Sequence, residues 1–128
     1  MQPLLLSSYT ATSCLGAGLG PTLEALRRHG SGLALCHFET VELETWVGEV
    51  AGVDQVVMRE GMSAFDCRNN RLALLGLMQD DFAGRVAASA ARVGAERVGV
   101  FIGTSTSGIL QTELAYRRRD PLTGALPA

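Results

Sequence analysis

The sequence contains little charge and few aromatic residues. Charged residues make up 19% of the 128 residues and aromatic residues 5%, and the formal net charge at pH 7 is only −2. Proteins that bind nucleic acid usually carry a strongly basic surface, so this composition predicts no nucleic-acid partner. Hydrophobic residues make up 47% of the chain, which is too much for intrinsic disorder and enough for one domain with an apolar core.

Three of the 11 basic residues form a cluster, Arg117 to Arg119, near the C-terminus. Three consecutive arginines at the end of a helix are more often a solvated surface than a binding site, and we interpret the cluster in that way.

Cysteine is also scarce. Cys14, Cys36 and Cys67 are widely separated, with no C-x-x-C pair and no histidine at the spacing of a metal ligand. The pattern is typical of reduced thiols in a cytoplasmic protein, and we expect neither a metal nor another cofactor. No segment approaches the roughly 20 apolar residues of a membrane helix, and the first residues lack the basic region of a signal peptide. We therefore expect a cytoplasmic protein with no membrane span.

The hydrophobic pattern predicts alternating strands and helices. We expect strands over residues 3–8, 46–50 and 97–102, and helices over residues 22–29 and 111–119. Between the last two strands we expect one long helix, which Asp66 or Asn69 caps and Gly94 ends. Its apolar positions recur at intervals of three and four: Leu72, Leu75, Met78, Phe82, Val86, Ala90 and Val93. This order indicates an α/β layered fold with a mostly buried sheet.

The glycine-rich segment GAGLGP, residues 16–21, is a first candidate for chemistry. A dinucleotide-binding turn has the pattern G-x-G-x-x-G, whereas here the third glycine comes one position early and proline follows it. We interpret the segment as a tight turn and expect no nucleotide.

A nucleophilic cysteine is a second candidate. Cys67 lies directly before the expected long helix, and a helix N-terminus lowers the pKa of a thiol. A base would also be required, but His29 and His37 both lie in a loop-like region. We therefore favour an inert, buried cysteine.

The segment FIGTSTSGIL, residues 101–110, combines the end of an expected strand with six small or hydroxyl-bearing residues. Small residues after a buried strand leave room for a group that approaches the backbone. Alternatively, the hydroxyl groups of Thr104 to Ser107 only cap the helix that follows.

Five motifs occur in order along the chain. They are SSYTATSCLG, in which Ser13 and Gly16 form an S-x-x-G turn, GSGL at 30–33, WVGEV at 46–50, NNRLA at 69–73 and RVGVFIGTSTSGI at 97–109. In this arrangement the sequence resembles the β-ketoacyl-acyl-carrier-protein synthases, condensing enzymes of the thiolase fold. The resemblance covers nearly the whole chain. It implies the N-terminal part of a thiolase-like layered αβαβα fold, in an enzyme that condenses acyl and malonyl thioesters with decarboxylation in fatty acid or polyene biosynthesis.

The sequence departs from the family in two ways. Ser8 and Thr10 stand where the family has glycines and Cys14 replaces a common proline, which suggests a divergent branch such as one that makes polyenes. The family's nucleophilic cysteine in a T-A-C-(S/T)-S context, its two catalytic histidines and its lysine have no match. The resemblance therefore implies that residues 1–128 are an incomplete N-terminal segment without catalytic residues, inactive alone.

The resemblance also implies a substrate site in the 103–108 loop. In the family this loop lies beside the acyl pocket near the dimer interface, and Thr106 occupies the position of a gate. The implied substrate-binding residues are Gly103, Thr104, Ser105, Thr106, Ser107 and Gly108.

The implied partners are acyl carrier protein and the rest of the synthase chain or a second ketosynthase-like subunit, in a dimer. Two alternatives remain at this point: a non-catalytic partner of the chain-length-factor type, and a free-standing small α/β binding domain.

Overall fold

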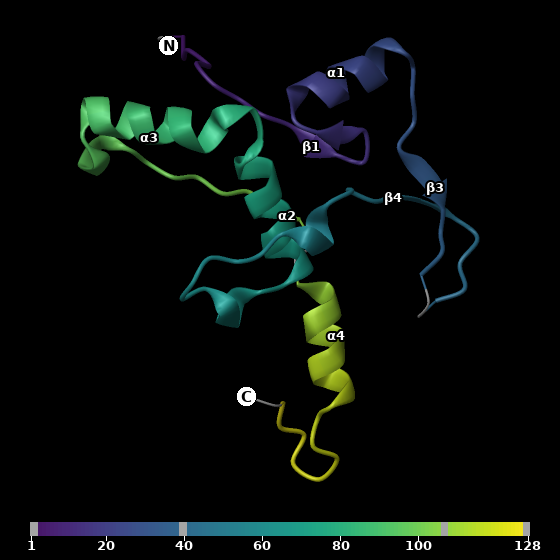
Figure 1. The fold of residues 1–128 in the computed structure, drawn as a ribbon. Coiled ribbons are helices and arrows are strands. Elements are labelled where there is room, and N and C mark those ends of the chain that lie inside the picture. Colours follow the sequence, from purple (N-terminus) through teal and green to yellow (C-terminus); the bar gives the residue numbers. More distant parts are fainter. Residues whose placement is uncertain (1–2, 39–40, 106–107, 127–128) are drawn as a thin grey trace. The chain divides into compact units, whose positions relative to one another are not determined.

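A computed structural model of the protein describes residues 3–38, 41–105 and 108–126. The chain divides into two compact units, residues 1–98 and 99–128, and each is considered by itself (Figure 1). Within the described residues the structure contains four α-helices and two small antiparallel sheets. The expected mixture of helices and strands is therefore confirmed and is compatible with an α/β protein, whereas the thiolase-like layered αβαβα fold stays a prediction.

The first unit begins with two β-hairpins on either side of a helix. Strands β1 (Thr12–Ser13) and β2 (Gly16–Ala17) form the first hairpin. Helix α1 (Leu19–Arg27) follows and begins three residues earlier than expected. Strands β3 (Leu33–Leu35) and β4 (Trp46–Gly48) form the second hairpin, in the register Leu33 to Gly48. The prediction of a strand at residue 46 is confirmed, but β3 replaces part of an expected loop.

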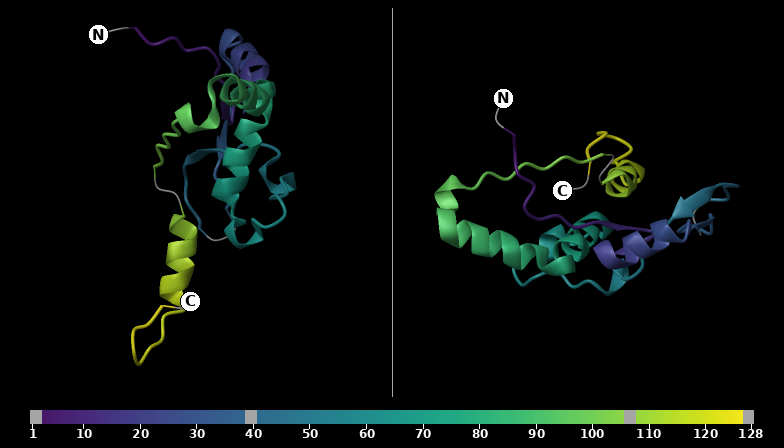
Figure 2. Two further views of the ribbon diagram at one scale, coloured as in Figure 1. Left: turned by 90° about the vertical axis from the view of Figure 1, so that its left-hand side faces the viewer. Right: turned by 90° about the horizontal axis from the view of Figure 1, so that it is seen from above.

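The prediction of one long helix from the hydrophobic pattern is wrong, because the segment forms two helices. Helix α2 (Arg68–Leu77) and helix α3 (Phe82–Val93) are separated by a short 3-10 turn over Gln79–Asp81, and they run in different directions (Figure 1 and Figure 2). Asp80 and Asp81 adopt left-handed backbone conformations, with φ values of 54° and 55°. Such a conformation costs roughly 1–2 kcal/mol per non-glycine residue. The expected end at Gly94 is confirmed, since this residue is the C-cap of α3.

Two expected strands are not formed in the described residues. Residues 3–8 and 98–102 have no regular structure, and residues 95–97 form a 3-10 turn. A β-strand satisfies its backbone groups by pairing with a neighbour, and no strand pairs with either segment here. The predictions of these strands, and of a buried sheet, are therefore wrong for the structure of this chain.

The second unit contains helix α4 (Ile109–Arg117), which begins and ends two residues earlier than expected. Gly108 is its N-cap, and its φ value of 74° lies in the left-handed region that favours glycine. After the helix, the Asp120 carboxylate accepts hydrogen bonds from the backbone N–H groups of Leu122 and Thr123, at 2.8 and 2.7 Å. These bonds stabilise the charged form and lower the pKa of Asp120.

The described residues contain almost no apolar core. Val53 is the one hydrophobic residue among them that is buried, with 2% of its surface exposed. The three leucines Leu4 to Leu6 and the segment from Val100 to Ile102 are at least three-quarters exposed. None of the helices in the described part of the chain is long and apolar enough to cross a membrane.

Candidate functional site

The 103–108 loop lies in the second unit, between an exposed extended segment and helix α4. Gly103, Thr104 and Ser105 are exposed, and no other atom lies within 4 Å of a β-carbon built at Gly103. Thr106 and Ser107 lie outside the described residues. Gly108 forms the N-terminus of α4, where its carbonyl oxygen accepts hydrogen bonds from the backbone N–H and the hydroxyl of Thr112, at 3.0 and 3.2 Å.

The alternative in which hydroxyl groups cap α4 receives no support from the described residues. The N-cap is Gly108, which has no side chain, and neither Thr104 nor Ser105 forms a hydrogen bond to the helix. Whether the loop lines a substrate pocket stays a prediction.

Three of the sequence motifs meet at Cys14 in the first unit. Cys14 lies in the turn between β1 and β2, and two glycines contact it: Gly32, which directly precedes β3, and Gly48, the last residue of β4. A β-carbon built at Gly48 would lie 2.7 Å from Cys14 Sγ, and one built at Gly32 would overlap the Cys14 carbonyl group. The two hairpins therefore pack against each other at positions where a β-carbon would clash with Cys14.

Alanine at Gly32 or Gly48 is expected to destabilise the contact between the hairpins. Forcing a methyl group into a filled space typically costs about 1–3 kcal/mol. Gly32→Ala should have the larger effect, because its new methyl group would meet backbone atoms rather than a side chain. The measurement is the free energy of unfolding of the natural protein, obtained by denaturant titration.

Gly20→Ala is the matched control for this prediction. Gly20 lies in α1, and no other atom lies within 4 Å of a β-carbon built there. Alanine in an open helical position is expected to raise the free energy of unfolding by about 0.5–1 kcal/mol. Equal effects at Gly20 and Gly32 would contradict the packing argument.

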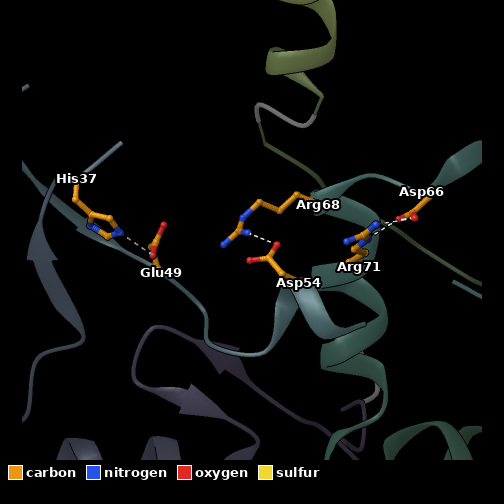
Figure 3. Close-up of polar contacts among 6 residues, drawn as sticks. All are labelled: His37, Glu49, Asp54, Asp66, Arg68 and Arg71. Carbon is orange, nitrogen blue, oxygen red and sulfur yellow. Dashed lines mark hydrogen bonds and ion pairs between the residues drawn. The ribbon is translucent and has the colours of Figure 1, made fainter. Parts of the chain in front are cut away.

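The cysteines and histidines do not form a nucleophilic pair in the described residues. Cys67 is the N-cap residue of α2, as the sequence suggests, but it is half-buried and no hydrogen bond joins any thiol to His29 or His37. His37 instead faces Glu49, with 3.5 Å between Nε2 and Oε2 (Figure 3). No group of three or more potential metal-binding side chains occurs in the described part of the chain.

Two ion pairs organise the start of α2 (Figure 3). Arg68 binds Asp54 at 2.6 Å, and Arg71 binds both oxygens of Asp66 at 2.5 and 2.7 Å. The hydrogen bond from Arg71 stabilises the charged carboxylate and lowers the pKa of Asp66. Asp66 therefore orients the first turn of α2 through Arg71. It is not the N-cap that the sequence suggested, and Asn69 lies inside the helix.

An open apolar hollow of about 380 Å³ lies between α2 and the segment before it. It is lined by Met58, Met62, Phe65, Asn70, Ala73, Leu74 and Leu77. The sequence reasoning missed this hollow, although the apolar residues Met58, Met62 and Phe65 are spaced by four and three. The hollow contains no charged side chain, so it offers shape and apolar surface but no catalytic group.

Comparisons with protein-family models, with curated proteins and with solved structures find no match for this chain.

Proposed function

We propose that this chain is the N-terminal part of a 3-oxoacyl-[acyl-carrier-protein] synthase, which condenses acyl and malonyl thioesters with loss of carbon dioxide. The proposal rests on the five motifs in order, and one structural observation carries it further. The apolar segment that leads into the 103–108 loop is exposed, with 79% of Val100, 96% of Phe101 and 86% of Ile102 accessible. Exposed apolar residues of this kind favour burial against further protein, as the proposal expects.

In the proposed layered αβαβα fold, this further protein completes a sheet. Residues 3–8 and 98–102 are both apolar and both lack a strand partner in the described structure. Pairing with other strands would satisfy their backbone groups and bury their side chains. The loop 103–108 would then stand at the end of a buried strand, where its small residues leave space for an acyl chain.

The condensation requires groups beyond those found here. A cysteine thiolate must attack the acyl thioester, and hydrogen-bond donors must stabilise the oxyanion that forms. No thiol in the described structure has a histidine partner. This chain would therefore contribute to the acyl pocket and to dimer contacts, with acyl carrier protein as the donor of substrate.

A non-catalytic partner of the chain-length-factor type is the second candidate. The lack of any thiol–histidine pair among the described residues is compatible with this role as well as with the first candidate. Such a partner would shape the same pocket next to a catalytic subunit. The two candidates differ only in whether the natural protein carries its own nucleophile.

An acyl-transfer experiment tests the proposal. We expect that acyl-[acyl carrier protein] transfers no acyl group to Cys14, Cys36 or Cys67, because none has an activating base. The natural protein would be incubated with the substrate and digested, and each cysteine peptide examined by mass spectrometry. Alkylation of the same peptides by iodoacetamide controls for thiol access.

The outcomes separate the candidates. Acylation at a cysteine outside residues 1–128 supports the synthase, and acylation only of a partner subunit supports the non-catalytic role. Acylation of Cys14, Cys36 or Cys67, or no acylation of any protein in the natural complex, would overturn the proposal.

A further inference from the structure

We propose that two hydrogen bonds to the Asp80 carboxylate, here called the latch, hold the junction of α2 and α3 bent. When these hydrogen bonds break, the same segment forms one continuous helix. The first observation is the hydrophobic pattern. At 100° per residue, the apolar positions before the junction and those after it fall on one face of a single helix. These positions are Leu72, Leu75, Met78, Phe82, Val86, Ala90 and Val93.

The junction itself contains no residue that forces a bend. Sharp kinks usually occur at proline, at glycine or where a side chain inserts into the helix. The turn between the helices is Gln79-Asp80-Asp81, with neither proline nor glycine, and two of its residues have left-handed φ values. Aspartate tolerates a left-handed backbone better than most residues, but the local sequence does not require the bend, which leaves a role for a contact from outside the segment.

The Asp80 carboxylate provides this contact. Its Oδ2 accepts a hydrogen bond from Thr10 Oγ1 at 2.7 Å and another from the backbone N–H of Leu19 at 2.9 Å. Leu19 is the first residue of α1, whose own N-cap, Gly18, provides no side-chain cap. Asp80 therefore caps α1 from 61 residues away, with its negative charge at the positive end of the helix.

A further hydrogen bond stabilises the bent state at the C-terminal end of α2. Gln79 Nε2 donates a hydrogen bond at 2.9 Å to the carbonyl oxygen of Leu75, in the last turn of α2. A straight helix would lose this hydrogen bond and the two hydrogen bonds of Asp80. In return it would gain backbone hydrogen bonds across the junction and right-handed helical φ values at Asp80 and Asp81. The direction of α3 is thereby linked to the capping of α1 and to the position of Thr10, in the segment that precedes β1.

Hydrogen–deuterium exchange of the natural protein tests the latch. In Asp80→Ala, we expect slower exchange of backbone amides over residues 79–84, which become helical, and faster exchange over residues 18–22, where α1 loses its cap. Since a hydrogen bond to a charged group contributes strongly, each change should be about tenfold or more. Thr10→Val should shift both regions in the same directions by less.

Asp81→Ala is the matched control. Asp81 has the same left-handed backbone, but no hydrogen bond joins it to Thr10 or Leu19 in the described structure. We expect the exchange of residues 18–22 to remain unchanged in this variant. The proposal is overturned if Asp80→Ala accelerates exchange in both regions, if it changes neither, or if Asp81→Ala reproduces its effect on α1.

Discussion

The isolated 128-residue chain is expected to self-associate at micromolar concentration. Among the described residues Val53 alone forms a buried apolar position, whereas large side chains such as Leu4, Phe101 and Leu122 are more than 90% exposed. Burial of one valine contributes about 1.5–3 kcal/mol, whereas apolar burial and dispersion in an ordinary domain amount to roughly 100 kcal/mol. Exposed apolar runs such as Val100 to Ile102 favour association or aggregation.

Light scattering and binding of a hydrophobic dye would measure this association. We expect polydisperse particles and strong dye fluorescence, without a sharp melting transition. A triple variant, Val100→Ser with Phe101→Ser and Ile102→Ser, should reduce association, because each substitution removes roughly 1.5–3 kcal/mol of transfer free energy. The control replaces the exposed Arg118 with serine, which leaves the apolar surface unchanged.

The result that would contradict the proposed fold is a stable monomer. A monodisperse chain with a cooperative melting transition would show that residues 1–128 bury their own apolar side chains. It would favour the free-standing binding domain over a segment of a larger synthase. If the chain becomes soluble only in the presence of further protein, the result would support the proposal that residues 1–128 are a segment of a synthase.

The sequence predicted helices better than strands, and the reason is physical. A helix satisfies its hydrogen bonds within one segment, so the apolar spacing around Leu72 and Val86 was enough to predict that this part of the chain is helical, although not that it divides into α2 and α3. A strand depends on a partner that its own sequence does not specify. Val98 to Ile102 is rich in apolar residues, yet it stays unpaired because no strand lies beside it in the described structure.

The bend between α2 and α3 could not be read from local sequence. Asp80 is compatible with a helix, and the partners that favour the bend, Thr10 and Leu19, lie more than 60 residues away. The contact of Cys14 with Gly32 and Gly48 also joins residues that lie far apart in the sequence, so local sequence does not predict it. The motifs identified these residues, but only the folded chain shows that the glycines allow two hairpins to approach.

Thr106 is the proposed gate of the acyl pocket. In the complete synthase, Thr106→Phe is expected to weaken the binding of long acyl chains about thirtyfold while leaving short primers nearly unaffected. The added ring would occupy space that methylene groups fill, and each excluded methylene forfeits about 0.8 kcal/mol. Loss of two or three methylene contacts amounts to roughly 2 kcal/mol, which corresponds to about thirtyfold in affinity. The measurement is the condensation rate with acyl primers of increasing length.

A matched substitution distinguishes a pocket from a structural turn. Thr112 is exposed on α4, and its hydroxyl bonds only the carbonyl oxygen of Gly108 in the described structure, so Thr112→Phe adds the same ring on a solvated surface. We expect Thr112→Phe to have the same effect on the condensation rate for acyl chains of every length. If Thr106→Phe also lowers the rate equally for every length, the loop serves only to connect a strand to α4. A loss confined to long chains would mean that the small residues between Gly103 and Gly108 are there to make room for the substrate.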